Sequence, residues 1–156
     1  MNSFKLVGVP IEPFAQLFAL SDAELATRNA RRVLATTKPG YPCRVSLADA
    51  DVGEELLLLP FQHQAASSPY QSSGPIFVRR GAVPANLETG VIPDYVGTRL
   101  MSVRGYDSAD LMTDALVCEG SEVKAAIQAM FDREEVAYIH LHNAKRGCFS
   151  CAAVRA

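Results

Sequence analysis

The chain has 156 residues, 49% of them hydrophobic and 21% charged, with a formal net charge of −2 at pH 7. This length can bury a hydrophobic core without a structural metal or disulfides, so we expect a single domain spanning residues 1–156. Basic residues occur at most in pairs, and no apolar run approaches the roughly 20 residues of a transmembrane helix, which argues against nucleic-acid and membrane partners.

The N-terminal segment predicts an edge strand followed by two short helices. Residues 4–9 form the strand, and Pro13 suits the first turn of the first helix. Ser21 and Glu24 have the spacing of a capping box, which predicts a second helix over residues 22–28. Because the segment lacks the sustained apolar stretch and cleavage site of a signal peptide, we expect a cytoplasmic protein.

The middle of the chain predicts three strands and two long connections. Residues 43–47 alternate between two faces, residues 56–59 form the apolar run of a central strand, and residues 76–80 resume a strand. The connections, residues 65–75 and 81–93, are punctuated by proline and glycine. Connections of this length are uncommon unless they carry function, so the first is a candidate wall of a ligand site.

The C-terminal half adds strands and the longest predicted helix. Residues 99–106 alternate as a strand, residues 115–118 form another, and Ser121 is a suitable N-cap for a helix. The apolar stripe of that helix consists of Val123, Ile127, Met130 and Phe131. Because regular helices do not separate the strands, we expect an α+β fold with one mainly antiparallel sheet of about seven or eight short strands and two or three helices.

The segment 136–154 holds the side chains with the richest chemistry. His140 and His142 alternate with apolar residues at the period of a strand, and residues 143–147 predict a hairpin loop. A return strand over residues 148–154 would then begin with Cys148. Two imidazoles and a thiol are therefore predicted to come together at one hairpin.

The register of this hairpin decides which cysteine faces the histidines. With a loop over 143–147, His142 opposes Cys148 and His140 opposes Ser150, so these side chains share one face. The apolar face would then hold Ile139, Leu141, Phe149 and Cys151. On this register Cys151 is a core thiol, and the CxxC spacing is accidental; a slip or bulge would exchange the faces.

Three blocks of the sequence resemble one bacterial family. They read KPGYPCRVSLADADVGEELLLLPFQHQ, SSPYQSSGPIFVRR and AYIHLHNAKRGCFSC. They are similar to the family called domain of unknown function 1203, and the similarity extends over essentially the whole chain. The resemblance implies a stand-alone, single-domain bacterial protein and assigns no activity, cofactor or catalytic residue.

One hypothesis is a metal site. His140, His142 and Cys148 would be the ligands, with His63 or Cys151 as a further ligand, because imidazole and thiolate suit zinc or a similar transition metal. The spacing matches no familiar zinc module, and no acidic residue lies nearby in the sequence.

A second hypothesis is a cysteine nucleophile. Cys148 would attack a substrate after activation by His140 or His142, in acyl transfer or thiol redox chemistry. Whether the protein is an enzyme stays open, because strand residues can lie this close without any chemistry.

A third hypothesis is a non-catalytic module that binds a small anionic molecule. Arginine side chains and hydroxyl groups suit a carboxylate or a phosphate. The candidate ligand-binding residues are Arg44, Arg79, Arg104, His63, Ser68 and Tyr70. The connections over residues 65–75 and 81–93 would fold over a pocket lined by the three arginines. We also expect His63 and the loop over residues 67–74 to approach the face of His140 and His142. The histidines can also be ordinary packing residues, and the sequence does not indicate an oligomeric state.

Overall fold

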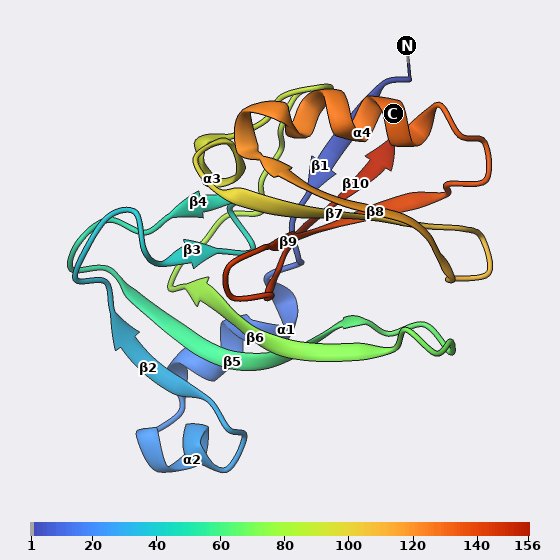
Figure 1. Ribbon diagram of the computed structural model, residues 1–156. Helices are drawn as coiled ribbons and strands as arrows, with labels where there is room; N and C mark the ends of the chain where they lie inside the picture. Colours follow the sequence, from blue (N-terminus) through green and yellow to red (C-terminus); the bar gives the residue numbers. More distant parts are fainter. Residues whose placement is uncertain (1) are drawn as a thin grey trace.

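The computed structural model describes residues 2–156, which form ten strands in two five-stranded sheets (Figure 1). The first sheet consists, in spatial order, of β1 (Phe4–Val7), β10 (Phe149–Arg155), β9 (Tyr138–Asn143), β7 (Leu100–Tyr106) and β8 (Met112–Glu119). The second consists of β2 (Arg31–Leu34), β5 (Glu55–Gln64), β6 (Ser72–Arg79), β3 (Pro42–Cys43) and β4 (Ala48–Asp49). All pairs are antiparallel except β3 with β6.

The expected α+β class is confirmed, with a different strand count and arrangement. The helices of the described chain are α1 (Glu12–Ala15), α2 (Asp22–Ala26), α3 (Asp94–Gly97) and α4 (Val123–Phe131), besides two 3-10 turns. The sequence indicated one sheet of seven or eight strands. The structure instead divides ten strands between two sheets, because short strands such as β2 and β4 carry little periodic pattern of their own.

Helix α4 covers one face of the first sheet (Figure 1). Its predicted apolar stripe is confirmed, since Val123, Ile127, Met130 and Phe131 are all buried. They pack against Met101 and Val103 of β7 and against Ile139 and Leu141 of β9. Alternation along each strand therefore leaves Ser102, Arg104, His140 and His142 on the opposite face.

The second sheet is dominated by the long β5–β6 hairpin. Strand β5 continues through Pro60, which pairs with Pro75 of β6. The connection predicted over residues 65–75 therefore shrinks to residues 65–71, because residues 72–75 belong to β6. This extension includes His63 in β5 and brings its ring close to that of His142 in the first sheet.

The strand predicted over residues 43–47 is shorter than expected. Only Pro42–Cys43 pairs as β3, and the chain then turns, with Leu47 at φ 52° and its N–H bonded to the Cys43 carbonyl at 3.0 Å. This turn buries the side chain of Arg44. The predicted strand that would carry Arg44 on one of its faces is therefore not formed, and the Arg44 side chain is not exposed to an anion in solution.

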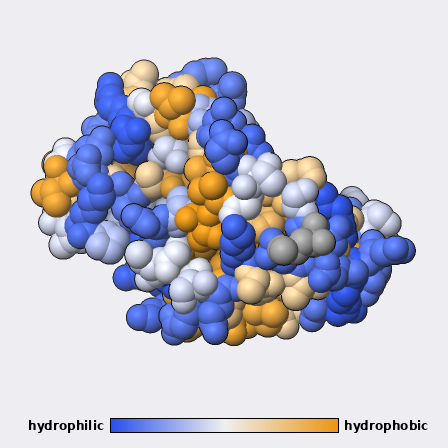
Figure 2. All heavy atoms as spheres, turned by 90° about the horizontal axis from the view of Figure 1, so that it is seen from above, coloured by the Kyte–Doolittle hydropathy of each residue, from blue (hydrophilic) through white to orange (hydrophobic). Residues whose placement is uncertain are grey.

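Hydrophilic residues cover much of the surface on the side of α4 (Figure 2). Seen from the side of α4, hydrophobic residues gather in a band at the middle, with mainly hydrophilic residues on either side (Figure 2). Within residues 2–156, no helix has the length and apolar character needed to cross a membrane.

Candidate functional site

The β9–β10 hairpin has a different register from the predicted one. His142 opposes Phe149 rather than Cys148, and an irregularity between Phe149 and Cys151 shifts the pairing so that Cys151 opposes Leu141. Gly147, at φ 77°, provides the left-handed residue of the loop. The predicted pairing of His142 with Cys148 is therefore wrong by one residue.

This one-residue shift separates Cys148 from the imidazoles. The N–H of Asn143 donates to the carbonyl of Cys148 at 2.9 Å, so these two residues close the hairpin. Opposed residues of a hairpin project from the same face, and Asn143 lies on the face opposite to His142. The predicted cluster of His140, His142 and Cys148 is therefore not assembled.

The prediction for Cys151 is confirmed. Its side chain is buried in the apolar core with Ile139 and Leu141, and burial raises its pKa to about 12. Both Cys148 and Cys151 are free thiols, so the CxxC spacing forms no disulfide. Cys148 is half-exposed and is the more accessible of the two.

Three imidazoles from the two sheets meet on the other face. The ring of His63 lies 4.9 Å from that of His142 and 6.4 Å from that of His140, measured between centroids. Phe149 stacks on His63 at 5.3 Å and contacts both other rings edge-on. The expected approach of His63 to the histidine face is therefore observed, and the register shift places Phe149 among the imidazoles instead of on the apolar face.

The three imidazoles are neutral at physiological pH. Burial lowers the pKa of His140 and of His142 to about 4, and it also lowers the pKa of His63. The positive charge of Arg104 contributes to all three shifts. Arg104 is therefore the cation of this face.

Each imidazole has a buried ring nitrogen without a hydrogen-bond partner among residues 2–156. These atoms are His63 Nδ1, His140 Nδ1 and His142 Nε2. The other nitrogen of His142, Nδ1, lies 2.9 Å from the carbonyl oxygen of Gly147. Since a carbonyl only accepts, Nδ1 donates, and neutral His142 keeps a lone pair at Nε2.

Arg104 lies directly beside these rings. It opposes His140 in the pairing of β7 with β9, and its Nε donates to Ser102 Oγ at 3.0 Å. Among the described residues no carboxylate forms an ion pair with it. Its terminal N–H groups are available to an anion.

Ser68 and Tyr70 lie at the outer end of this face. Ser68 Oγ donates to the Asp110 carbonyl at 3.0 Å, and the Tyr70 ring lies 6.0 Å from that of Tyr106. Tyr106 in turn lies 5.1 Å from His140. The two loop residues therefore support the aromatic wall of the face and do not touch the imidazoles themselves.

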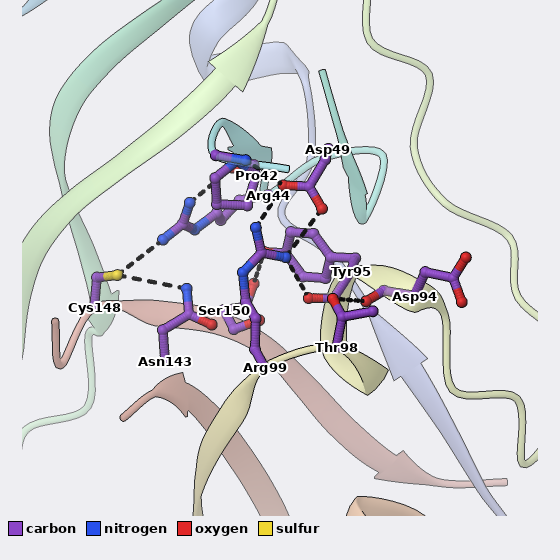
Figure 3. A network of polar contacts seen from close by, with 11 residues as sticks. Pro42, Arg44, Asp49, Asp94, Tyr95, Thr98, Arg99, Asn143, Cys148 and Ser150 are labelled. Carbon is purple, nitrogen blue, oxygen red and sulfur yellow. Dashed lines mark hydrogen bonds and ion pairs between the residues drawn. The ribbon is translucent and has the colours of Figure 1, made fainter. Parts of the chain in front are cut away.

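A second polar centre surrounds Cys148 (Figure 3). The buried Arg44 donates from Nη2 to Cys148 Sγ at 3.1 Å, and Asn143 Nδ2 lies 3.6 Å from the same sulfur. Arg44 also donates to the carbonyls of Phe149 at 2.8 Å and Pro42 at 2.7 Å. These two bonds fix the guanidinium beside the thiol.

The three candidate arginines do not form one anion site. Arg79 pairs with Glu54 at 3.1 Å, Arg44 donates to carbonyls and sulfur, and Arg104 donates to Ser102. The connection over residues 81–93 packs on the core beneath α4 instead of covering the arginines. Only Arg104 keeps a role beside the histidines.

Neither a formed metal site nor a large cavity coincides with the predicted residues. Within residues 2–156 no three His, Cys, Asp or Glu side chains are arranged to hold a metal ion, and zinc binding stays a prediction. A cavity of about 640 Å³ lies between α2 and the β5–β6 hairpin, and one of about 250 Å³ lies beside β1. Neither is lined by a predicted site residue.

Comparison with known proteins identifies the family. Residues 40–155 match the model of a family described as a protein of unknown function (DUF1203). The chain belongs to this family. No curated protein and no solved structure matches the chain.

Sequence reasoning missed three contributors to these centres in this DUF1203 chain. The sequence pattern places Phe149 on the apolar face and Asn143 only in the hairpin loop. Asp110 accepts from the Tyr138 hydroxyl at 2.7 Å and has φ 63°, which is unusual for a residue other than glycine. The position of Asp110 in a short turn after Ser108 and Ala109 gave no signal of its contact with Tyr138.

Proposed function

We propose that this DUF1203 protein performs thiol chemistry, with Cys148 as the reactive group. The observation that carries the proposal is the buried guanidinium of Arg44, which donates to Cys148 Sγ at 3.1 Å. A neighbouring cation stabilises a thiolate, and the thiolate is the nucleophilic form of cysteine. Asn143 supplies a second, weaker donor at 3.6 Å.

The charge balance around Arg44 supports this assignment. Five of the described arginines are buried or half-buried: Arg32, Arg44, Arg79, Arg99 and Arg104. Three of them, Arg32, Arg79 and Arg99, pair with carboxylates. Arg44 is only 1% exposed and has no such partner among residues 2–156. A buried cation is costly without a counter-charge, and a thiolate at Cys148 supplies one.

The surroundings of Cys148 restrict the reaction class. No histidine nitrogen is among its hydrogen-bond partners in the described chain, so no general acid is at hand to protonate a leaving group. A disulfide suits this centre because its leaving group departs as a thiolate. The Cys148 thiolate would attack one sulfur of a small-molecule disulfide, forming a new S–S bond, breaking the old one and releasing the second sulfur as thiolate.

The resulting mixed disulfide would persist until a second small thiol attacks it. Cys151 is the nearest cysteine in sequence, but it is fully buried, and burial raises its pKa to about 12. It is therefore a poor resolving thiol. We propose a single-cysteine mechanism instead of a CxxC mechanism.

The first experiment measures the order in which the cysteines react. Native protein is treated with limiting iodoacetamide, and the labelled positions are mapped by peptide mass spectrometry. Cys148 should react first. Cys118 is the internal control, because it is also half-exposed while burial, Glu122 and Glu119 raise its pKa. Equal labelling of Cys118 and Cys148, or protection of Cys148, would contradict the proposal.

The second experiment tests the reaction class. Native protein is incubated with oxidised glutathione, and the intact mass and the modified peptide are determined. One glutathione adduct per chain, located at Cys148 and absent from a Cys148→Ser variant, is the expected result. If Cys148 is alkylated but forms no mixed disulfide, the reactive thiol stands and disulfide exchange is excluded as its reaction.

A further inference from the structure

The face that carries the three histidines also carries an unpaired cation. Arg104 Nε is bonded to Ser102, but no carboxylate among residues 2–156 pairs with its guanidinium. Arginine presents a planar fork that binds a carboxylate or a phosphate through two parallel hydrogen bonds. This side chain therefore offers a place for one oxyanion.

The imidazoles beside it offer hydrogen-bond acceptors. His142 is 1% exposed and His140 is 7% exposed, and each has a ring nitrogen without a partner in the described chain. For His142 that nitrogen is Nε2, which can only accept while Nδ1 donates to Gly147. Buried polar atoms are nearly always satisfied, so a ligand that donates a hydrogen bond fits this position.

We infer that this face, formed by Arg104, His63, His140 and His142, binds a small organic oxyanion that also carries a hydroxyl or amino group. The oxyanion is held by the Arg104 fork, and the hydroxyl or amino group donates to an imidazole nitrogen. A carboxylate and a phosphate share this chemistry. The inference concerns a site separate from Cys148 and does not rest on the thiol chemistry.

The surroundings of this face suit a small ligand. Arg104, Ser102, His63 and Tyr138 are half-exposed, so solvent reaches the cation from one side. The neighbouring strand β8 is open to solvent on that side, since Val117, which pairs with Ser102, is 60% exposed. Tyr106 and Tyr138, stacked with centroids 5.2 Å apart, form an aromatic wall at the other end. Asp110 lies at this wall, but its carboxylate is engaged by the Tyr138 hydroxyl.

The histidine content of the chain makes the test direct. The protein has three histidines, and all three lie on this face, so ring signals of ¹⁵N-histidine-labelled protein report only on the site. The experiment is an NMR titration at neutral pH in a Cys148→Ser background, where thiol reactions cannot contribute. The probes are glycolate, which has both groups, acetate, which lacks the hydroxyl, and ethylene glycol, which lacks the charge. Glycerol 3-phosphate is the phosphate counterpart of glycolate.

We expect glycolate or glycerol 3-phosphate to shift the ring signals saturably. Acetate should bind about tenfold more weakly than glycolate, because one hydrogen bond to a buried acceptor is lost. Ethylene glycol should cause no saturable shift. Whichever of the two anions binds more tightly identifies the source of the oxyanion as carboxylate or phosphate.

Three variants separate binding from general charge effects. Arg104→Gln removes the fork and should abolish saturable binding, and Arg104→Lys keeps the charge and should retain weakened binding. Arg28→Gln removes one exposed positive charge elsewhere and should leave binding unchanged. The inference is overturned if neither anion shifts the rings, if ethylene glycol binds as well as glycolate, or if folded Arg104→Gln binds like the parent. Equal affinity for acetate and glycolate overturns the inference that an imidazole nitrogen accepts a hydrogen bond from the ligand.

Discussion

The guanidinium of Arg44 lies 3.1 Å from the sulfur of Cys148, although the two residues are 104 positions apart in the sequence. Arg44 follows β3 of the second sheet, and Cys148 immediately precedes β10 of the first. The bonds of Arg44 to the carbonyls of Pro42 and Phe149 hold the two segments together. The same residue therefore joins the sheets and sets the charge beside the thiol.

Arg44→Lys should slow alkylation of Cys148. Lysine keeps the charge but lacks the fork that bonds two carbonyls and the sulfur at once, so we expect a rate about three- to tenfold lower. The rate is measured by time-resolved mass spectrometry with excess iodoacetamide, after circular dichroism has shown that the variant is folded. Arg80→Lys, at an exposed arginine paired with Glu55, is the matched control and should react at the parent rate. An unchanged rate in folded Arg44→Lys would limit Arg44 to a structural role.

Acid should destabilise the contact between the sheets through the buried histidines. The pKa of His140 and of His142 is about 4 in the folded chain, against 6.5 for a free histidine. Between these two pKa values the unfolded chain binds more protons than the folded chain. The contribution of the two histidines to the free energy of unfolding is therefore fully present above about pH 6.5. It falls by about 3 kcal/mol for each ring as the pH drops toward about 4.

Urea unfolding across this pH range measures the effect. His140→Phe keeps a ring among its aromatic neighbours but cannot titrate, so its unfolding free energy should vary less with pH than that of the parent. A variant whose pH dependence equals the parent's would show that His140 does not contribute to it.

Tyr138→Phe should destabilise the outer end of the histidine face. The hydroxyl of Tyr138 donates to Asp110 at 2.7 Å and accepts from Gln64 at 3.0 Å. Losing both bonds should lower the free energy of unfolding by about 1–2 kcal/mol. The control is Tyr41→Phe, whose hydroxyl contacts Thr36 at an exposed position, and it should change stability much less. Equal effects in urea unfolding would contradict the role assigned to the Tyr138 hydroxyl.

Gly8→Ala should destabilise the fold around Arg44. A Cβ at this position would lie 2.5 Å from the Arg44 carbonyl oxygen and 2.7 Å from that of Val45, and both are backbone atoms that cannot rotate away. We expect a loss of about 1–3 kcal/mol in the free energy of unfolding. Gly74→Ala is the control, because nothing lies within 4 Å of its added Cβ. A stable Gly8→Ala variant would mean that the approach of β1 to the Arg44 backbone tolerates displacement.

The elements predicted well from sequence are those whose causes are local. The capping box of Ser21 and Glu24 is present at the start of α2, although the helix ends at Ala26 instead of continuing to residue 28. The α4 stripe and the alternation along β7 also match, because periodic burial on one face leaves a pattern in neighbouring residues. The same reasoning placed Cys151 in the core.

By itself, the sequence determined the α+β class, the hairpin near the C-terminus and the identity of its polar side chains. Only the tertiary structure decided which of them meet. Phe149 is buried against His63 and Phe61 of the distant strand β5, and the register with its irregularity before Cys151 accommodates this burial. The same register carries Cys148 to Arg44 and leaves His140 and His142 with His63. The local pattern of a hairpin specifies which residues alternate between its two faces. The residues that bury each face come from elsewhere in the chain. The one-residue shift in the pairing register of β9 with β10 could therefore not be predicted from that pattern.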